Sequence, residues 1–251
     1  MKVSFNELQS LSWKAFIGLG FSDGQASDAA DMLCWMESCG LDGVKTLKDA
    51  LEQYSLEHPY SPPDILYKDT DVTVLDAHNI SVLACSHLPL ELAFTQARAR
   101  GLSVLKIRRC RQRQLIMGYL ARLANRGMNV TAFWRNSQTP LTEQVVGFRA
   151  SSSVPSIRIY AVSELPDENK DNTGITVVMA NHVDLLPTMR SEYEYDLLAR
   201  HDENDLLEVR SKTEREGITV DAALWEQLQA LAKLTLVAST ASSRLGAGPA
   251  D

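Results

Sequence analysis

The sequence predicts a mixed α/β protein, in which an N-terminal helical unit precedes a sheet domain with flanking helices. This prediction rests first on residues 88–135, which read in turn as helix, strand, helix and strand. It rests also on residues 1–58, where apolar side chains recur at helical spacing before the closely spaced prolines of residues 59–63. The expected units are a helical unit over 1–58, a sheet domain over 64–238 and a Ser/Gly/Ala-rich tail over 239–251.

The helical unit is predicted to hold successive short helices. Ser4, with Glu7 three residues later, forms the capping-box pattern that begins a first helix. A second helix is expected from residue 22 or 23 to Cys39. After a glycine-containing break, a third and shorter helix is expected over Val44–Leu56.

The sheet domain begins with a predicted strand over Asp71–Ala77, which a turn at His78–Asn79 ends. A helix follows and stops at Gly101. We expect this helix to bury one face, which consists of Leu88, Leu92, Thr95 and Ala99.

Strands are predicted at residues 103–108 and 128–134, and a helix over 115–126 joins them. Two strands joined by a helix of this length form a βαβ unit. The sequence therefore predicts a parallel pair with a right-handed crossover.

The last part of the chain alternates between strand and helix patterns. Ser156–Val162 and Gly174–Ala180 read as strands, and the polar stretch between them predicts a hairpin. Residues 189–216 are rich in helix formers and are predicted to form a helix that ends at Gly217. Asp221 is expected to cap a final amphipathic helix.

Composition narrows the class of protein. The 251-residue chain has 45% hydrophobic residues and a formal net charge of −7, which argues against nucleic-acid binding. No apolar run is long enough to span a membrane, and no signal sequence is recognisable at the start of the chain. The four cysteines form no C-x-x-C pair, so we expect a reduced compartment, the cytoplasm by default.

The strongest local feature is a basic run at the end of the strand over 103–108. It consists of Lys106, Arg108, Arg109, Arg111 and Arg113. Ligands of open α/β sheets bind at the carboxyl ends of strands, so the run predicts a pocket for a carboxylate or phosphate. The alternatives are a solvated basic rim or an interface patch, because charge runs are usually solvated.

Catalytic candidates are few. Cys110 lies within the basic run, where neighbouring cations are expected to lower the pKa of its thiol, but a structural role is the more common one. His87, before a helix, and His78, in the adjacent turn, are placed to line one end of the sheet, although each is more often an ordinary loop or cap residue. The five histidines show no metal-ligand spacing, so no metal site is expected.

Nucleotide-binding signatures are absent from the sequence. There is no G-x-G-x-x-G and no Walker loop, so a standard Rossmann or P-loop site is not predicted. The nearest glycine-rich piece is Gly246–Gly248, which follows Arg244. Such a tract is more often a flexible tail, and the alternative is an ordered arm that brings Arg244 to a ligand.

Several segments in a shared order resemble the malate/L-lactate dehydrogenase-like family, which includes sulfolactate dehydrogenases and is distinct from Rossmann dehydrogenases. The matching segments are VSFNELQSLSWKAFIGLGFSDGQASDAADML, CGLDGVKTLKDALEQY, LPLELAFTQARARGLSVLKIRR, GYLARLANRGMNVTAFWRNS and REGITVDAALWEQLQALAKL. The segments GLGFSDG, GLDGV and SRLGAG are closer still to a bacterial family of unknown function. The resemblance implies the dehydrogenase-like fold and a homodimer.

Departures from the family pattern argue against its chemistry. The dehydrogenases carry Ser-His-Gly after a Gly-hydrophobic-Asp step, and their histidine serves catalysis and substrate binding. Here Gly40–Asp42 continues into Gly43 and Val44. The family's second histidine motif is replaced here by residues 109–113. The chain is also shortened between residues 180 and 189. In that region the family has much of its cofactor-binding portion and a catalytic aspartate. Hydride transfer needs an acid or base and a held nicotinamide.

Two functions therefore remain open. The first is a non-dehydrogenase relative without a cofactor, which binds a small carboxylate or phosphate or acts as a subunit beside a metabolic enzyme. The second is an NAD(P)-dependent oxidoreductase of 2-oxo, 2-hydroxy or imino acids with a rebuilt site. In the second, the arginines hold the substrate carboxylate or the cofactor phosphate, and His87 or His182 supplies the proton.

Overall fold

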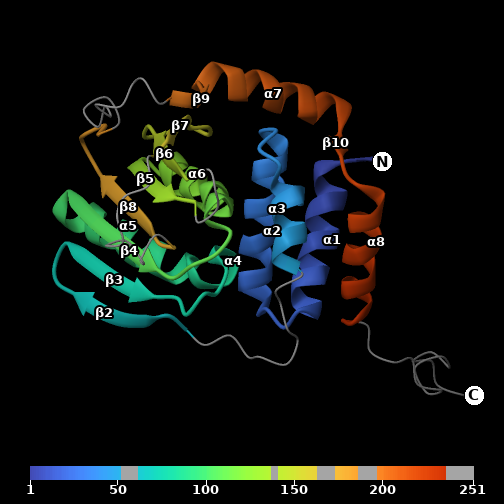
Figure 1. Ribbon diagram of the computed structural model, residues 1–251, viewed down its shortest axis with the longest axis horizontal. Coiled ribbons are helices and arrows are strands. Elements are labelled where there is room, and N and C mark those ends of the chain that lie inside the picture. Colours follow the sequence, from blue (N-terminus) through green and yellow to red (C-terminus); the bar gives the residue numbers. More distant parts are fainter. Residues whose placement is uncertain (52–61, 137–140, 163–172, 186–196, 236–251) are drawn as a thin grey trace, which may run out of the picture.

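The computed structural model describes residues 1–51, 62–136, 141–162, 173–185 and 197–235, without the side chains of 49 and 50. A group of helices stands side by side at the right of Figure 1, and a sheet with its own helices lies at the left. The group consists of α1 (Phe5–Gly18), α2 (Asp23–Ser38), α3 (Gly43–Leu51) and α8 (Ala222–Lys233). Its last member comes from the other end of the chain and packs against α1.

The helix starts follow from capping residues. Ser4 and Glu7 form the predicted capping box, in which Oγ of Ser4 accepts a hydrogen bond from the Glu7 amide at 3.2 Å. Asp221 caps α8 by accepting from the amides of Ala223 and Leu224. Beside these helices, β1 (Lys2–Val3) pairs with β10 (Ile218–Thr219), so the two ends of the described chain are joined.

Within the described residues, the sheet has eight strands in the order β2-β3-β4-β8-β5-β6-β7-β9. The strands are β2 (Asp64–Lys68), β3 (Val72–Asp76), β4 (Leu102–Arg108), β5 (Asn129–Arg135), β6 (Thr142–Phe148), β7 (Ser156–Ala161), β8 (Ile175–Ala180) and β9 (Leu197–His201). Only β3 and β4 are adjacent and parallel, because every other neighbouring pair is antiparallel.

One face of this sheet is covered by helices. These are α4 (Val82–Cys85), α5 (His87–Arg100), the 3₁₀ turn η1 (Arg113–Ile116) and α6 (Met117–Asn125). The side chains of Leu105 and Ile107 in β4, and of Val177 in β8, point to this face and are fully buried. Since side chains alternate along a strand, the residues between them point to the opposite face, here called the open face.

The predicted parallel pair needs a correction. The strands predicted at 103–108 and 128–134 exist as β4 and β5 and run in the same direction, but β8 is inserted antiparallel between them. The predicted hairpin of Ser156–Val162 with Gly174–Ala180 is also wrong. These strands exist as β7 and β8, but β7 pairs with β6 and β9 instead. The polar stretch between β7 and β8 connects strands at different positions of the sheet, which local sequence does not reveal.

Other predictions were correct in type and wrong in detail. The helix ending at Gly101 exists as α5, but Leu88 is 68% exposed, and the buried face consists of Pro89, Leu90, Ala93, Phe94 and Ala97. The single helix predicted over 189–216 is wrong in its described part, where β9 precedes α7 (Glu203–Glu216). Strands β2 and β6 were not predicted.

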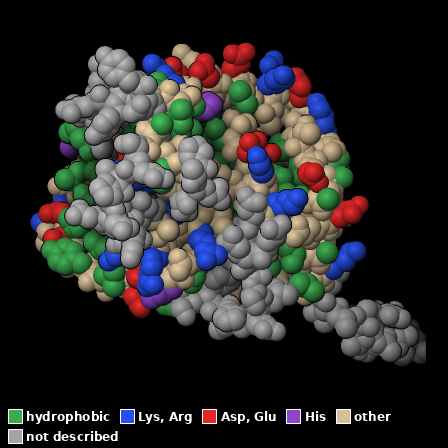
Figure 2. Space-filling view, viewed as in Figure 1, with side chains coloured by type: hydrophobic (Ala, Val, Ile, Leu, Met, Phe, Trp, Pro, Cys, Tyr) green, Lys and Arg blue, Asp and Glu red, His purple; other side chains and the backbone are tan. Residues whose placement is uncertain are grey.

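Helix α7 lies across the top of the molecule, above both the sheet and the N-terminal helices (Figure 1). Only Leu206 of this helix is buried, and Figure 2 shows acidic and basic side chains along this upper edge. Among the described residues, no helix is long and apolar enough to cross a membrane.

Close packing of α6 on α2 depends on Gly118. A Cβ atom at this position would lie 2.6 Å from Cα and 2.9 Å from the carbonyl oxygen of Met32. We expect Gly118→Ala to lower the free energy of unfolding by about 1–3 kcal/mol in urea titrations, because the backbone of α2 must move. Gly24→Ala is the control, since a Cβ atom there meets nothing within 4 Å, and it should leave stability unchanged or slightly higher. Equal effects of the two substitutions would contradict this account.

Candidate functional site

The carboxyl ends of β3 and β4 lie side by side, and the loops that follow them continue in parallel. The amide of Ala77 donates to the Arg108 carbonyl at 2.9 Å, and the amide of Arg111 donates to the Ile80 carbonyl at 3.1 Å. Left-handed backbone conformations, uncommon in residues other than glycine, cluster in these loops. They occur at His78 (φ 50°), Asn79 (φ 65°), Arg109 (φ 49°) and Gln112 (φ 48°). Such clusters mark places where surrounding contacts hold a strained chain.

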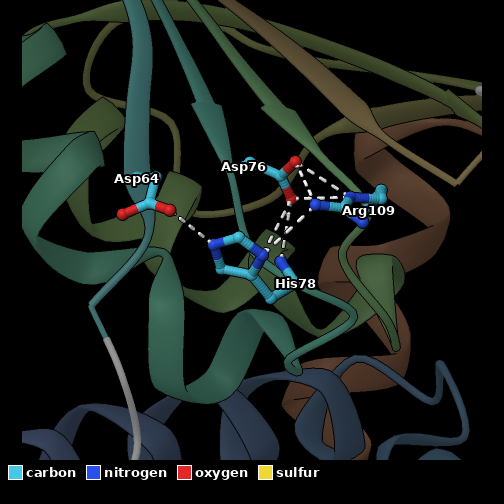
Figure 3. Close-up of polar contacts among 4 residues, drawn as sticks. All are labelled: Asp64, Asp76, His78 and Arg109. Carbon is cyan, nitrogen blue, oxygen red and sulfur yellow. Dashed lines mark hydrogen bonds and ion pairs between the residues drawn. The ribbon is translucent and has the colours of Figure 1, made fainter.

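A cluster of polar side chains, here called the turn cluster, fixes these loops (Figure 3). It consists of Asp64, Asp76, His78 and Arg109. The guanidinium of Arg109 binds Asp76 through two nitrogens, and its Nε lies 2.8 Å and 2.9 Å from the two carboxylate oxygens. Its Nη2 also lies 3.2 Å from Nδ1 of His78, and Nε2 of His78 lies 2.9 Å from Asp64. Arginine only donates, so this geometry fits the His78 tautomer with its proton on Nε2.

The electrostatics of the turn cluster centre on Asp76. Its side chain is 10% exposed, whereas that of Arg109 is 45% exposed. The hydrogen bonds from Arg109 hold the pKa of Asp76 below its usual value. The amide of His78 also donates to Asp76 at 2.9 Å and so stabilises the turn.

Arg113 acts within the fold rather than on its surface. Its Nη1 donates to the Cys110 carbonyl and its Nη2 to the Arg135 carbonyl, each at 2.8 Å. Burial lowers the pKa of this guanidinium. Arg113 therefore joins the loop after β4 to the end of β5.

Cys110 is fully buried, and burial raises the pKa of its thiol to about 12. This corrects the expectation that the neighbouring cations would lower the pKa, because desolvation outweighs the charge of Arg113. A thiol of this kind is a weak nucleophile at neutral pH.

Lys106 and Arg108 point to the open face of the sheet. Lys106 is exposed, and it lies opposite Thr176 of β8, which in turn lies opposite Phe133 of β5. Two residues farther along β5 is Arg135, whose Nε lies 3.0 Å from Glu143. These five residues, Lys106, Arg108, Phe133, Arg135 and Thr176, are here called the open-face site.

The basic run is thus divided into different environments. Lys106 and Arg108 belong to the open-face site, Arg109 to the turn cluster, and Arg113 to the joint between β4 and β5. Arg111 is exposed in the parallel loop. Four residues near the basic run could not be predicted from sequence, since only strand register brings them there: Asp76, Phe133, Arg135 and Thr176.

The other predicted candidates lie elsewhere. His87 is half-buried at the start of α5, in a largely apolar pocket of about 290 Å³ that Leu75 also lines, so it is on the helix-covered side of the sheet. Burial lowers the pKa of its imidazole. His182 follows β8 at the sheet end opposite to Arg108. Arg244 is outside the described residues.

The start of α3 follows Gly40–Asp42 directly. Oε2 of Glu37 accepts a hydrogen bond from the Val44 amide at 2.8 Å. A Cβ atom at Gly43 would lie 2.7 Å from Cβ of Met36, and the Val44 side chain is 6% exposed. The turn therefore packs against α2.

Among the described residues, no group of His, Cys, Asp and Glu is arranged to hold a metal ion.

Comparison with protein families supports one resemblance directly. Residues 3–87 match the family described as "Protein of unknown function (DUF3726)". The matched range contains GLGFSDG and GLDGV, which confirms the resemblance to a family of unknown function. No curated protein sequence matches the chain.

Comparison with solved structures identifies the fold. The malate dehydrogenase of Entamoeba histolytica aligns with a TM-score of 0.66 and 12% identity over 96% of this chain and 99% of that one. Sulfolactate dehydrogenase of Methanocaldococcus jannaschii gives 0.66 and 13%, over 94% and 98%. Δ1-Piperideine-2-carboxylate reductase of Pseudomonas syringae pvar. tomato gives 0.60 and 13%, over 92% and 99%. At these identities, the comparison establishes the malate/lactate dehydrogenase-like fold, as predicted, and no activity.

The Arg109–Asp76 pair should be needed for stability. We expect Arg109→Met to lower the free energy of unfolding by about 1–2 kcal/mol at pH 7, because it leaves a nearly buried carboxylate without its main partner. Arg98→Met, at an exposed position of α5, is the control and should change stability by less than about 0.5 kcal/mol.

The same pair sets a pH dependence. The pKa of Asp76 is lowered in the folded state, so its contribution is complete above the unfolded pKa near 3.9 and is lost as pH falls through the lower folded value. The stability difference between the wild type and Arg109→Met should therefore shrink below about pH 4. A difference that is constant from pH 7 to pH 3 would argue against the Asp76 assignment.

The thiols should be unreactive in the folded protein. All four cysteines are free and buried. We expect no reaction with a thiol reagent such as DTNB in minutes at pH 8, and four equivalents after unfolding in guanidinium. Rapid reaction of Cys110 in the native state would mean that its surroundings open readily.

Proposed function

We propose that this protein is a non-dehydrogenase relative of the malate/lactate dehydrogenase-like proteins and binds a small carboxylate or phosphate at the open-face site. The observation that carries the proposal is the placement of Lys106 and Arg108 on the sheet face opposite to the helices, at the carboxyl end of β4. In an otherwise acidic chain, this concentration of positive charge favours anions.

The turn cluster supports this role by holding the loops beside the site. Asp76 lies opposite Arg108 in the parallel pair of β3 and β4, and it binds Arg109. The buried carboxylate therefore fixes one arginine of the run, while Lys106 makes no salt bridge in the described part of the chain. A flexible, hydrated ammonium group that reaches solvent is suited to an exchangeable anion.

The start of α3 supports the absence of dehydrogenase chemistry. Where the sequence resemblance would place the family's Ser and His, this chain has Gly43, at which no Cβ fits without displacing α2, and the buried Val44. The carboxylate of Glu37 binds the Val44 amide there. Neither side chain of this turn can transfer a proton to a substrate.

An NAD(P)-dependent oxidoreductase of 2-oxo, 2-hydroxy or imino acids is the alternative, favoured by the similar structures, whose names denote dehydrogenases or reductases of organic acids. In this version, the cations of the open-face site hold the substrate carboxylate or the cofactor phosphate. His87 lies on the opposite side of the sheet and His182 at its other end, so neither stands beside these cations as the proton donor.

The expected oligomeric state comes from the resemblance to the dehydrogenase-like family. A homodimer in the cytoplasm remains our expectation, and a subunit role beside a metabolic enzyme is the function to test if no small ligand binds.

A thermal-shift panel tests the proposal. It would include acetate, succinate, inorganic phosphate, and NAD and NADP in both redox states. A ligand that binds only the folded state adds RT ln(1 + [L]/Kd), about 2.7 kcal/mol at a hundredfold excess over Kd. We expect the melting temperature to rise with small anions and to stay unchanged with dinucleotides.

Matched variants locate the response. Lys106→Met should abolish the shift and leave the melting temperature without ligand unchanged, because Lys106 is exposed. Lys212→Met on α7 removes the same charge far from the site and should keep the shift. A response to reduced dinucleotide alone would favour the oxidoreductase, and no response to any compound would reject both ligand proposals.

A further inference from the structure

The two sides of the open-face site differ in chemistry. On the β4 side lie the cations Lys106 and Arg108. On the β5 side lie Phe133, which is partly exposed, and Arg135, whose charge is offset by Glu143 at 3.0 Å. Thr176 of β8 lies between the two sides. The site therefore offers a cationic side and an aromatic side.

Strand register sets the span between these sides. Lys106, Thr176 and Phe133 form one row across three adjacent strands. Neighbouring strands lie roughly 4.8 Å apart, so the backbones of Lys106 and Phe133 are separated by about 10 Å. Thr176 has a short side chain with a hydroxyl group, and the longer chains of Lys106 and Phe133 stand on either side of it.

The aromatic side is set by packing. Phe133 packs against Val145 and Tyr160, which are 9% and 6% exposed and form an apolar cluster separate from the main core. These residues share the open face through the pairing of Phe133 with Val145, and of Tyr160 with Glu143 beside it. The ring is thereby held on the sheet surface beside the cations, which is the arrangement that a planar group can stack on.

We infer that the ligand of the open-face site is an anion that carries a planar ring, with its carboxylate or phosphate at Lys106 and its ring against Phe133. The inference rests on the proposed function and specifies its ligand class. Aromatic acids and nucleoside monophosphates share the required chemistry.

Paired probes test the inference by isothermal titration calorimetry. Benzoate is compared with acetate, and AMP with ribose 5-phosphate, so that each pair differs by the ring. We expect the member with the ring to bind roughly three- to tenfold more tightly, the range for one aromatic contact. A preference within the first pair alone points to an aromatic acid, and one within the second pair alone to a nucleotide; either supports the inference.

Phe133→Leu removes the ring and keeps an apolar side chain for packing against Val145. It should abolish the preference for the probe with the ring and leave the affinity for acetate or ribose 5-phosphate unchanged. Phe5→Leu, at a residue of α1 that is 40% exposed, is the matched control and should keep the preference.

The outcomes separate this inference from the proposed function. If acetate and ribose 5-phosphate bind through Lys106 but benzoate and AMP bind no better, the inference is overturned and the proposed function stands. If Phe133→Leu keeps the preference, the ring lies elsewhere and the inference is also overturned. If no probe binds, both fail.

Discussion

The insertion of β8 between β4 and β5 is the constraint on which the arrangement of this protein depends. It separates two strands that run in the same direction, and it places Thr176 between Lys106 and Phe133. It also buries Val177 and Met179 beneath the helices. If β8 presented its other face to the helices, these apolar side chains would be exposed. Since side chains alternate along every strand, the same burial that stabilises the sheet directs Lys106 to the open face.

The fold class could be predicted from sequence because apolar period and capping are local. Ser4 and Asp221 begin helices, and Gly101 ends α5 with φ 96°. Strand partners could not be predicted, since alternation in β7 and β8 shows that each is a strand and carries no information on its neighbour. The predicted face of α5 was wrong for a related reason. More than one stripe had helical spacing, and only the position of β4 and β8 selects the buried one.

The position of the basic run in the fold was predictable, but the arrangement of its side chains was not. The basic run did fall at the carboxyl end of a strand. Strand alternation and the left-handed conformations at Arg109 and Gln112 then sent neighbouring cations in different directions. Arg113, which the sequence predicts as a ligand-binding residue, donates hydrogen bonds to two backbone carbonyls. A cation count along the sequence therefore overstates the charge that any one ligand can reach.

The division of the cations also explains why an acidic protein can keep a positive site. A guanidinium held by a buried carboxylate, as Arg109 is by Asp76, loses freedom to bind another anion but fixes the loop in its strained conformation. Lys106 lies within β4, has no left-handed backbone conformation to hold, and is exposed to solvent. The rigid pair therefore holds the backbone of the loop next to an exposed cation. A fold fixes the positions of side chains and leaves their chemistry to the sequence, so the fold shared with dehydrogenases does not by itself determine what the open face of this sheet does.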